Sequence, residues 1–319
     1  MKRSRCLGGL FFVSGVVLGI ALHSLPHRIA YAQPRSEALP LADLHFHAER
    51  GLAPDAALGM MDRAGVRWAG TGPKGGDPIW RPYVAAAPDR FIPFGGQGAI
   101  GTRIQSQGET AWMLKSPELN RYLDTVLEPA LREGRVKGIG ELFVNNDHTH
   151  ARDFQPTRYP VDSPLMQRLF KLSSTYRVPL SVHMEGDPAS IEELERLLPT
   201  DRNGVVIWAH CGFWSEASEV QGLMDHHPNL LCELSHREGR AHSTRLRVVP
   251  IMSGGRLRPD WKTLLERHSD RFLIGTDVNE PNQYQEIIGF YREIFTQLTP
   301  DAAKRIAHGN AMQLFRLSQ

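Results

Sequence analysis

The chain has 319 residues, of which 41% are apolar, 23% charged and 8% aromatic, a composition that supports a sizeable core and excludes wholesale disorder. Lysine plus arginine (37) nearly balances aspartate plus glutamate (35), and no long basic block indicates nucleic-acid binding. Three cysteines are too few for a disulfide scaffold.

The N-terminal 32 residues have the organisation of a secretory signal. Basic residues at positions 2, 3 and 5 precede an apolar run, Leu7–Leu22, and Ala30-Tyr31-Ala32 then has the form of a cleavage site. We expect cleavage after Ala32 and a periplasmic or secreted protein. Because the apolar run is slightly long for a signal, an uncleaved membrane anchor is the alternative.

Downstream, short apolar and β-branched runs alternate with amphipathic helical patterns. We predict eight strands, at Leu41–His47, Val66–Thr71, Phe91–Gly95, Val136–Phe143, Pro179–Met184, Val205–His210, Asn229–Leu234 and Phe272–Asp277. Helices are expected to begin at Ser116-Pro117, Ser163-Pro164 and Thr299-Pro300, because each pair places an N-capping side chain before a proline. The alternation predicts an α/β fold, a parallel (β/α)8 TIM barrel, in a single domain over residues 38–319. A doubly wound sheet is the weaker alternative, since no G-x-G-x-x-G or P-loop follows a strand.

Export would leave two cysteines, Cys211 and Cys232, in an oxidising compartment. Both lie in apolar strand-like runs, so they could pair or stay as buried thiols, and we expect buried, unpaired thiols. No second hydrophobic span follows the leader, so the mature chain should be soluble or held only by that leader.

Ionisable residues stand where the predicted strands end. In Asp43-Leu44-His45-Phe46-His47 the two histidines are two apart on a strand, so both imidazoles can converge on one metal ion. The later strand ends carry Glu141, His183, His210 and Asp277. Catalytic groups collect at this end of a barrel, and an unpaired buried charge or imidazole costs on the order of several kcal/mol. Packing alone is therefore a poor explanation for the whole set.

This ordered set resembles the amidohydrolase superfamily, most closely its amidohydrolase-related branch, which includes lactonases and non-oxidative decarboxylases. The ending Ile306-Ala307-His308-Gly309-Asn310-Ala311 also resembles the closing helix of that branch, and the resemblance covers roughly residues 40–316. It implies that a divalent metal, most often zinc, is bound by His45, His47, His183 and Asp277.

The resemblance leaves the number of metal ions open. A glutamate at position 141, where some members have lysine, excludes a carbamate bridge. One ion, or two joined by Glu141, are both compatible with this residue. His210 resembles the strand-6 histidine that contacts the substrate or a second metal.

The resemblance implies a metal-dependent hydrolase or decarboxylase, and because export tilts the choice towards hydrolysis, we expect a hydrolase acting on a small lactone, ester or amide. Bound zinc lowers the pKa of its water towards about 7. Asp277 would then act as general base and later as general acid, while the metal and His210 polarise the attacked carbonyl. A metal-dependent non-oxidative decarboxylase with the same ligands is the first alternative. An exported barrel that binds without catalysis is the second.

Two loop motifs indicate a function less specifically than the residues at the strand ends. Arg237 follows the seventh predicted strand on the active-site side and is a candidate clamp for a substrate carboxylate, although exposed loop arginines are common. His148-Thr149-His150 lies in a polar loop, where solvated histidines are expected.

The expected partner is a small-molecule substrate. We expect no binding to nucleic acid, and contact with a membrane only if the leader stays uncleaved. The oligomeric state is left open.

Overall fold

The structure, a computed structural model, describes residues 39–47, 52–71, 77–146, 157–239, 248–278 and 281–318. The predicted leader and the His148-Thr149-His150 loop lie outside these ranges. Within them, no helix is both long enough and apolar enough to cross a membrane.

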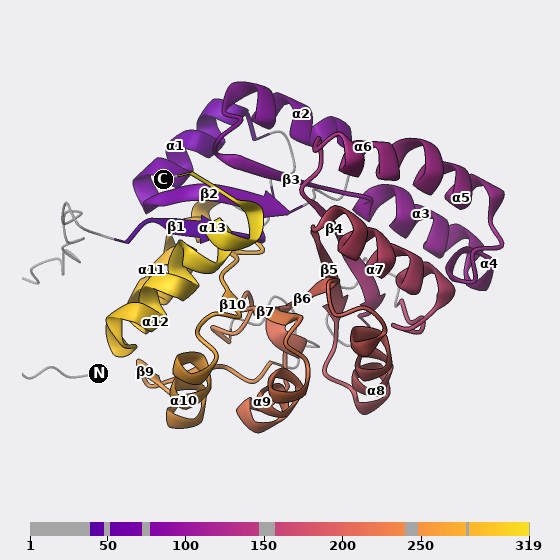
Figure 1. Ribbon diagram of the computed structural model, residues 1–319. Coiled ribbons are helices and arrows are strands. Elements are labelled where there is room, and N and C mark those ends of the chain that lie inside the picture. Colours follow the sequence, from indigo (N-terminus) through magenta and orange to yellow (C-terminus); the bar gives the residue numbers. More distant parts are fainter. Residues whose placement is uncertain are drawn as a thin grey trace, which may run out of the picture. The chain divides into compact units, whose positions relative to one another are not determined.

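Eight parallel strands form one sheet in the order β1-β2-β3-β4-β5-β6-β7-β10 (Figure 1). A parallel bridge between Asp43 and Ile274 joins the first strand to the last, and the Leu44 amide donates to the Ile274 carbonyl at 2.8 Å. The sheet therefore curls into the predicted (β/α)8 barrel. Its strands are β1 Leu41–Asp43, β2 Val66–Thr71, β3 Phe91–Gly95, β4 Gly138–Asn145, β5 Pro179–Met184, β6 Val205–Ala209, β7 Leu230–Glu233 and β10 Phe272–Leu273.

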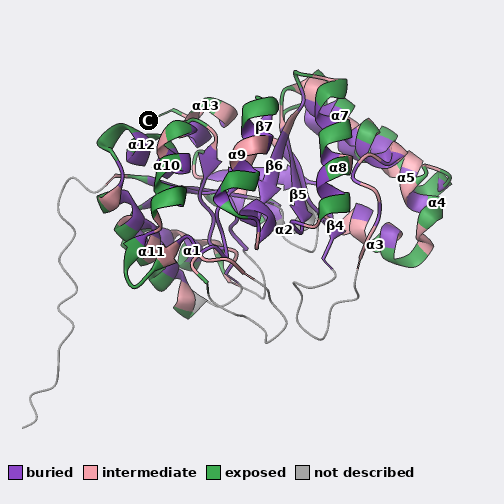
Figure 2. Ribbon diagram, turned by 90° about the horizontal axis from the view of Figure 1, so that it is seen from below, coloured by how far each residue is buried: buried purple, intermediate pink, exposed green. Residues whose placement is uncertain are grey.

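Helices surround the sheet and turn their buried faces towards it (Figures 1 and 2). They are α1 Pro54–Ala64, α2 Asp77–Ala86, α3 Gln97–Gln107, α4 Glu109–Trp112, α5 Pro117–Tyr122, α6 Glu128–Arg132, α7 Pro164–Tyr176, α8 Pro188–Leu197, α9 Ala217–His226, α10 Pro259–Arg267, α11 Tyr284–Gln297, α12 Pro300–Lys304 and α13 Asn310–Phe315. Two π-helical segments, η1 Leu123–Leu127 and η5 Arg305–Gly309, continue neighbouring α-helices, and the 3-10 turns are η2 Leu198–Thr200, η3 His210–Gly212 and η4 Pro281–Gln283. β8 Met252–Ser253 pairs with β9 Arg256–Leu257 in a small hairpin.

The predicted helix starts are confirmed, two of them with their caps. The Ser116 and Ser163 hydroxyls accept hydrogen bonds from backbone amides three residues on, at 3.1 and 3.5 Å. These bonds satisfy amides that lack a partner within the helix. The helix α12 begins at Pro300 as expected, but Thr299 caps it without a side-chain hydrogen bond.

One end of the barrel interior is filled by apolar side chains. Trp68, Ile92, Phe94 and Leu273 belong to one buried cluster with Phe315 of α13, and the rings of Phe94 and Phe315 are 5.7 Å apart. Charged groups in this packed end would lose hydration without compensation. Buried polar side chains therefore gather at the opposite end, where the strands finish.

Two strands end four residues earlier than predicted, β1 at Asp43 and β10 at Leu273. β1 stops at Asp43, because the Asp43 carboxylate accepts the His45 amide at 3.0 Å and ends the strand before the histidines. The same carboxylate accepts the Thr276 amide at 3.0 Å and its hydroxyl at 2.8 Å, and the Asp277 amide donates to the His45 carbonyl at 2.8 Å. Asp43 thus fixes the segments after β1 and β10 side by side.

The prediction of unpaired thiols is wrong, because Cys211 and Cys232 form a disulfide. Cys232 lies on β7 beside Trp208 of β6, and the chain turns back immediately after β6. Cys211 adopts a left-handed conformation (φ 48°) in that turn, and its Cα lies 5.0 Å from that of Cys232. Such a conformation is rare for residues other than glycine, so the strand-like sequence gave no sign of it.

Candidate metal centre

The residues predicted to bind metal come together at the carboxyl ends of the strands. All are buried except Asp277, whose side chain is 15% exposed: His45, His47, Glu141, His183, His210 and Asp277. Two groups of three contain all six, and in each group one donor atom per residue lies within 4.8 Å of the others. By the same distance, His210 also groups with His45 and Glu233, and with His236 and Asp277.

The first triad consists of His45, His47 and Asp277. One oxygen of Asp277, Oδ1, lies 2.6 Å from His47 Nε2 and 3.5 Å from His45 Nε2. The three side chains come from the segments after β1 and β10, which the Asp43 carboxylate holds together. Two imidazole nitrogens and a carboxylate oxygen are donors that zinc accepts.

The second triad consists of Glu141, His183 and His210. Glu141 Oε1 lies 2.9 Å from His183 Nδ1 and 3.1 Å from His210 Nε2, and the two imidazole nitrogens are 3.0 Å apart. The residue before Glu141, Gly140, has φ +100°, and a Cβ there would lie 2.3 Å from the Ser181 carbonyl oxygen. Only glycine fits at that point, where β4 lies directly beside β5 and the register of the pair is irregular.

Glu141 connects the two triads. Its Oε1 belongs to the second triad, whereas its Oε2 lies 3.1 Å from His45 Nε2 of the first triad. Each carboxylate oxygen therefore faces a different triad. This is the arrangement that a carboxylate shared between two cations requires.

Three residues that we did not single out from the sequence complete the centre. Glu233 Oε2 lies 2.9 Å from His45 Nδ1, and the Ser235 hydroxyl lies 2.8 Å from Glu233 Oε2 and 2.7 Å from His210 Nδ1. His236 Nε2 lies 2.5 Å from Asp277 Oδ2. Glu233 ends the seventh strand as Glu141 ends the fourth, so the same pattern could have identified it.

The donor set fits a divalent cation. Glu233 accepts a hydrogen bond from His45 Nδ1, which turns Nε2 towards the triads, where its lone pair becomes available once a metal displaces the Nε2 proton. His45 Nε2 is buried, and within the described part of the chain it forms no well-aligned hydrogen bond, although Glu141 Oε2 is 3.1 Å away. A buried lone pair among carboxylate oxygens is suited to a metal ion.

Electrostatic coupling dominates the ionisation of the centre. Burial disfavours the charged form of His45, but the carboxylates of Glu141 and Asp277 outweigh it and raise the His45 pKa well above its ordinary value. Burial likewise opposes ionisation of Glu141 and Asp277, yet the charge of His45 holds both pKa values well below the usual range. Burial lowers the pKa of His210 well below normal, so its imidazole is neutral and available as a ligand.

Gly275 leaves the space in which His45 and Glu233 meet. A Cβ at this position would lie 2.3 Å from His45 Cβ and 2.5 Å from Glu233 Oε1. We expect Gly275→Ala to displace the His45 imidazole, lowering metal affinity about 10–100-fold and stability by about 1–3 kcal/mol. Metal titration and thermal unfolding measure the two effects.

A matched control is available on α11. A Cβ at Gly289 meets nothing within 4 Å, so Gly289→Ala should leave metal affinity unchanged. Metal binding by Gly275→Ala that equals that of Gly289→Ala would show that the close approach at Gly275 does not matter for the centre.

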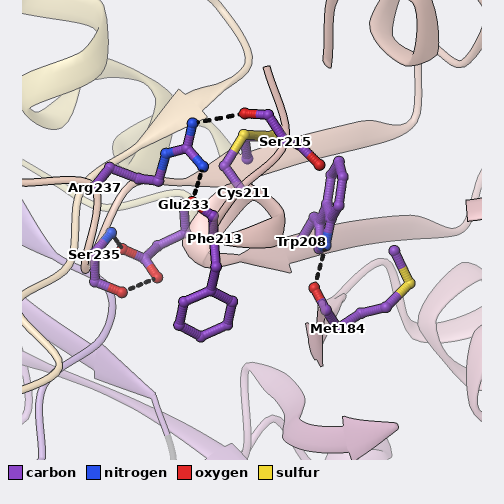
Figure 3. Close-up of a disulfide and its surroundings, with 9 residues drawn as sticks. Met184, Trp208, Cys211, Phe213, Ser215, Glu233, Ser235 and Arg237 are labelled. Atoms are coloured by element: carbon purple, nitrogen blue, oxygen red, sulfur yellow. Dashed lines mark hydrogen bonds between the residues drawn. A yellow bond between two sulfur atoms is a disulfide. The ribbon is translucent and has the colours of Figure 1, made fainter. Parts of the chain in front are cut away.

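Arg237 was expected to clamp a substrate carboxylate, and its position in the structure contradicts this role. The side chain is fully buried, its guanidinium lies 4.4 Å from the Trp261 ring centre, and it donates to the carbonyls of Phe213 and Ser215 (2.8 Å for Ser215; Figure 3). Burial lowers the Arg237 pKa to about 9, so the group is still a cation at neutral pH. A guanidinium held in this way serves the protein interior and does not face a substrate.

Comparison with known proteins identifies the family. The family model described as Amidohydrolase matches residues 50–317, most of the chain. The chain belongs to the amidohydrolase family. A search of curated proteins found no match to this chain. The superfamily resemblance inferred from the strand-end residues is thereby confirmed.

Several solved structures share the fold of this amidohydrolase. An uncharacterized TIM-barrel protein from Bordetella bronchiseptica is 18% identical with a TM-score of 0.53, and 82% of each chain is covered. A dihydroxybenzoic acid decarboxylase from Polaromonas, solved with manganese and 2-nitroresorcinol, is 15% identical with a TM-score of 0.51, covering 88% of this chain and 98% of the decarboxylase. A 4-oxalomesaconate hydratase from Rhodopseudomonas palustris is 16% identical with a TM-score of 0.51, covering 82% and 80%. At these identities the likeness shows the fold alone.

Proposed function

We propose that this protein is a metal-dependent hydrolase that acts on a small carbonyl substrate, a lactone, ester or amide, and holds two divalent ions. The observation that carries the proposal is Glu141, whose two carboxylate oxygens face the two triads separately. In this assignment His45, His47 and Asp277 hold one ion, and His183 and His210 hold the other. The histidine-rich donor set favours zinc.

Ions bound at such a centre supply Lewis acidity, which polarises a carbonyl and eases the deprotonation of water. Asp277 is the residue placed to move the proton. Its Oδ1 contacts His47 of the same triad, and its Oδ2 lies 2.5 Å from His236 Nε2. Asp277 is also the most exposed member of the two triads. We assign it as the base that takes a proton from the attacking water and as the acid that protonates the leaving group.

The neighbours of the triads favour a neutral substrate. Among the described residues, the side chains within bonding distance of the triads are histidines, carboxylates and Ser235, with no lysine or arginine. Arg237, the expected carboxylate clamp, donates to backbone carbonyls. Within the described residues, a substrate carboxylate would thus meet two buried carboxylates and no lysine or arginine, whereas an ester or amide carbonyl carries no charge to compensate.

A non-oxidative decarboxylase is the second candidate, supported by the similar fold of the manganese-bound decarboxylase from Polaromonas. Zinc- or manganese-loaded protein incubated in ¹⁸O-labelled water with lactones, esters, amides and hydroxybenzoates separates the candidates. The hydrolase predicts an ¹⁸O-labelled carboxylic acid and no carbon dioxide. Carbon dioxide release without ¹⁸O incorporation would establish the lyase. A protein that takes up neither metal and turns over none of these substrates would be the non-catalytic binding barrel.

Metal binding is expected to depend steeply on pH. In the metal-free protein the raised pKa of His45 keeps its imidazole protonated at neutral pH, and a metal must displace that proton. Affinity should therefore be greatest above this pKa and should fall as the pH decreases, about tenfold per pH unit for each proton displaced. Calorimetric titration in buffers of different ionisation enthalpy measures both affinity and proton release. An affinity that stays constant from mildly alkaline to mildly acidic pH would contradict the assignment of His45.

We also propose that the protein is exported, as its N-terminal sequence predicts. The Cys211–Cys232 disulfide supports this proposal, because structural disulfides persist in oxidising compartments. Mass spectrometry of the protein recovered from its native compartment tests it. A mature N-terminus after Ala32 is the expected result, and intact residues 1–32 in the cytoplasm would refute it.

A further inference from the structure

The turn that carries His210 has an unusual backbone. Four consecutive residues after β6 have positive φ, namely His210 (60°), Cys211 (48°), Gly212 (72°) and Phe213 (59°). The left-handed region is sterically unfavourable for residues with a Cβ, so such a turn persists only where its surroundings hold it.

Two restraints hold this turn, and both come from β7 or the segment after it (Figure 3). The disulfide joins Cys211 in the middle of the turn to Cys232 on β7. The buried guanidinium of Arg237 donates to the carbonyls of Phe213 and Ser215 and lies over the Trp261 ring. The turn is therefore fixed covalently in its middle and by charge-assisted hydrogen bonds at its end.

The restraints act next to metal-site residues. Cys211 follows His210 directly, and Cys232 directly precedes Glu233. The Ser235 hydroxyl lies 2.7 Å from His210 Nδ1 and 2.8 Å from Glu233 Oε2. The covalent link and this hydrogen-bonded link thus run in parallel between the same two strand ends.

We propose that the Cys211–Cys232 disulfide and Arg237 are positioning residues for the second triad: together they hold His210 where it can bind a metal ion. The proposal rests on the proposed function for the assignment of His210 as a ligand. Without the disulfide, the turn can leave its left-handed conformation and His210 moves away from Glu141 and His183. The first triad lies on the segments after β1 and β10 and keeps its ion.

The test compares oxidised protein with two forms that lack the disulfide. One is the double variant Cys211→Ala/Cys232→Ala. The other is the wild type treated with a phosphine, which supplies two electrons while two protons convert the disulfide to two thiols; the phosphine becomes its oxide with oxygen from water. We expect both forms to bind the first zinc ion normally and the second at least about tenfold more weakly. Phosphine treatment of the double variant is the control for reagent effects, and Arg237→Ala should weaken the second ion in the same direction.

Hydrogen exchange in the metal-free protein gives a readout that does not depend on the ions. The proposal predicts faster exchange of the backbone amides over residues 210–215 in both disulfide-free forms. Unchanged exchange, or faster exchange with unchanged affinity for the second ion, would overturn the positioning role. If the oxidised protein binds no second ion, the two-ion function fails, and the exchange data alone then decide whether the disulfide holds the turn.

Discussion

Asp277→Asn should lower kcat by about 10²–10⁴-fold, the usual contribution of a general acid–base group. The asparagine has nearly the same shape, and its amide oxygen can still face His47, but it cannot accept the proton of the attacking water. His236 loses a charged partner at 2.5 Å. Because the Asp277 carboxylate no longer offsets the burial that disfavours the charged form of His236, the His236 pKa should fall. Steady-state kinetics at saturating zinc, with the metal content of each preparation measured, check the prediction.

A surface aspartate supplies the control for this substitution. Asp301 is exposed in the first turn of α12, so Asp301→Asn should keep both wild-type kcat and metal content. If Asp277→Asn turned over substrate as fast as Asp301→Asn with the same metal content, Asp277 would be neither base nor indispensable ligand.

Glu141→Gln should reduce the bound metal from two ions to one and lower turnover by at least about 100-fold. Glutamine keeps the size of the side chain but offers one neutral oxygen, so it cannot serve both triads. In the metal-free protein the substitution leaves buried His45 without its strongest electrostatic partner. Breaking a buried charged pair in this way costs about 3–5 kcal/mol.

The cost of Glu141→Gln should depend on pH with a definite sign. The folded-state pKa of Glu141 lies well below its ordinary value of 4.5, so its stabilisation is present above that value and is lost as the pH falls towards the depressed pKa. The free energies of unfolding of the metal-free wild type and of the variant should therefore approach each other as the pH becomes acidic. The control is Glu133→Gln, which removes only an exposed pair with Arg135 and should cost at most about 1 kcal/mol. Two ions per chain in Glu141→Gln would rule out the bridge.

Much of the fold could be predicted because its determinants are local. All eight strands lie where apolar and β-branched runs predicted them, and Ser116 and Ser163 cap the helices that they were expected to start. The same reasoning selected the six candidate metal-site residues that the fold brings together, since an ionisable group at the end of a buried strand is visible along the chain.

Other features could not be predicted, because they depend on contacts between distant segments. The i, i+2 spacing of His45 and His47 suggested convergence within a strand, but the strand ends at Asp43, and contacts with Thr276 and Asp277 fix that segment. Glu233 was missed although it ends a strand, and His236 was passed over in favour of its neighbour Arg237.

The sequence by itself determined the barrel, the order of its elements and the residue types that meet at its carboxyl end. Local periodicity and capping specify these features, and a parallel barrel brings all strand ends to one place. Only the tertiary structure decided that the two oxygens of Glu141 face different triads, that Cys211 pairs with Cys232, and that Arg237 points into the interior. The reason is that side-chain direction at strand ends follows from left-handed turns and long-range hydrogen bonds, which leave no periodic signal in the chain.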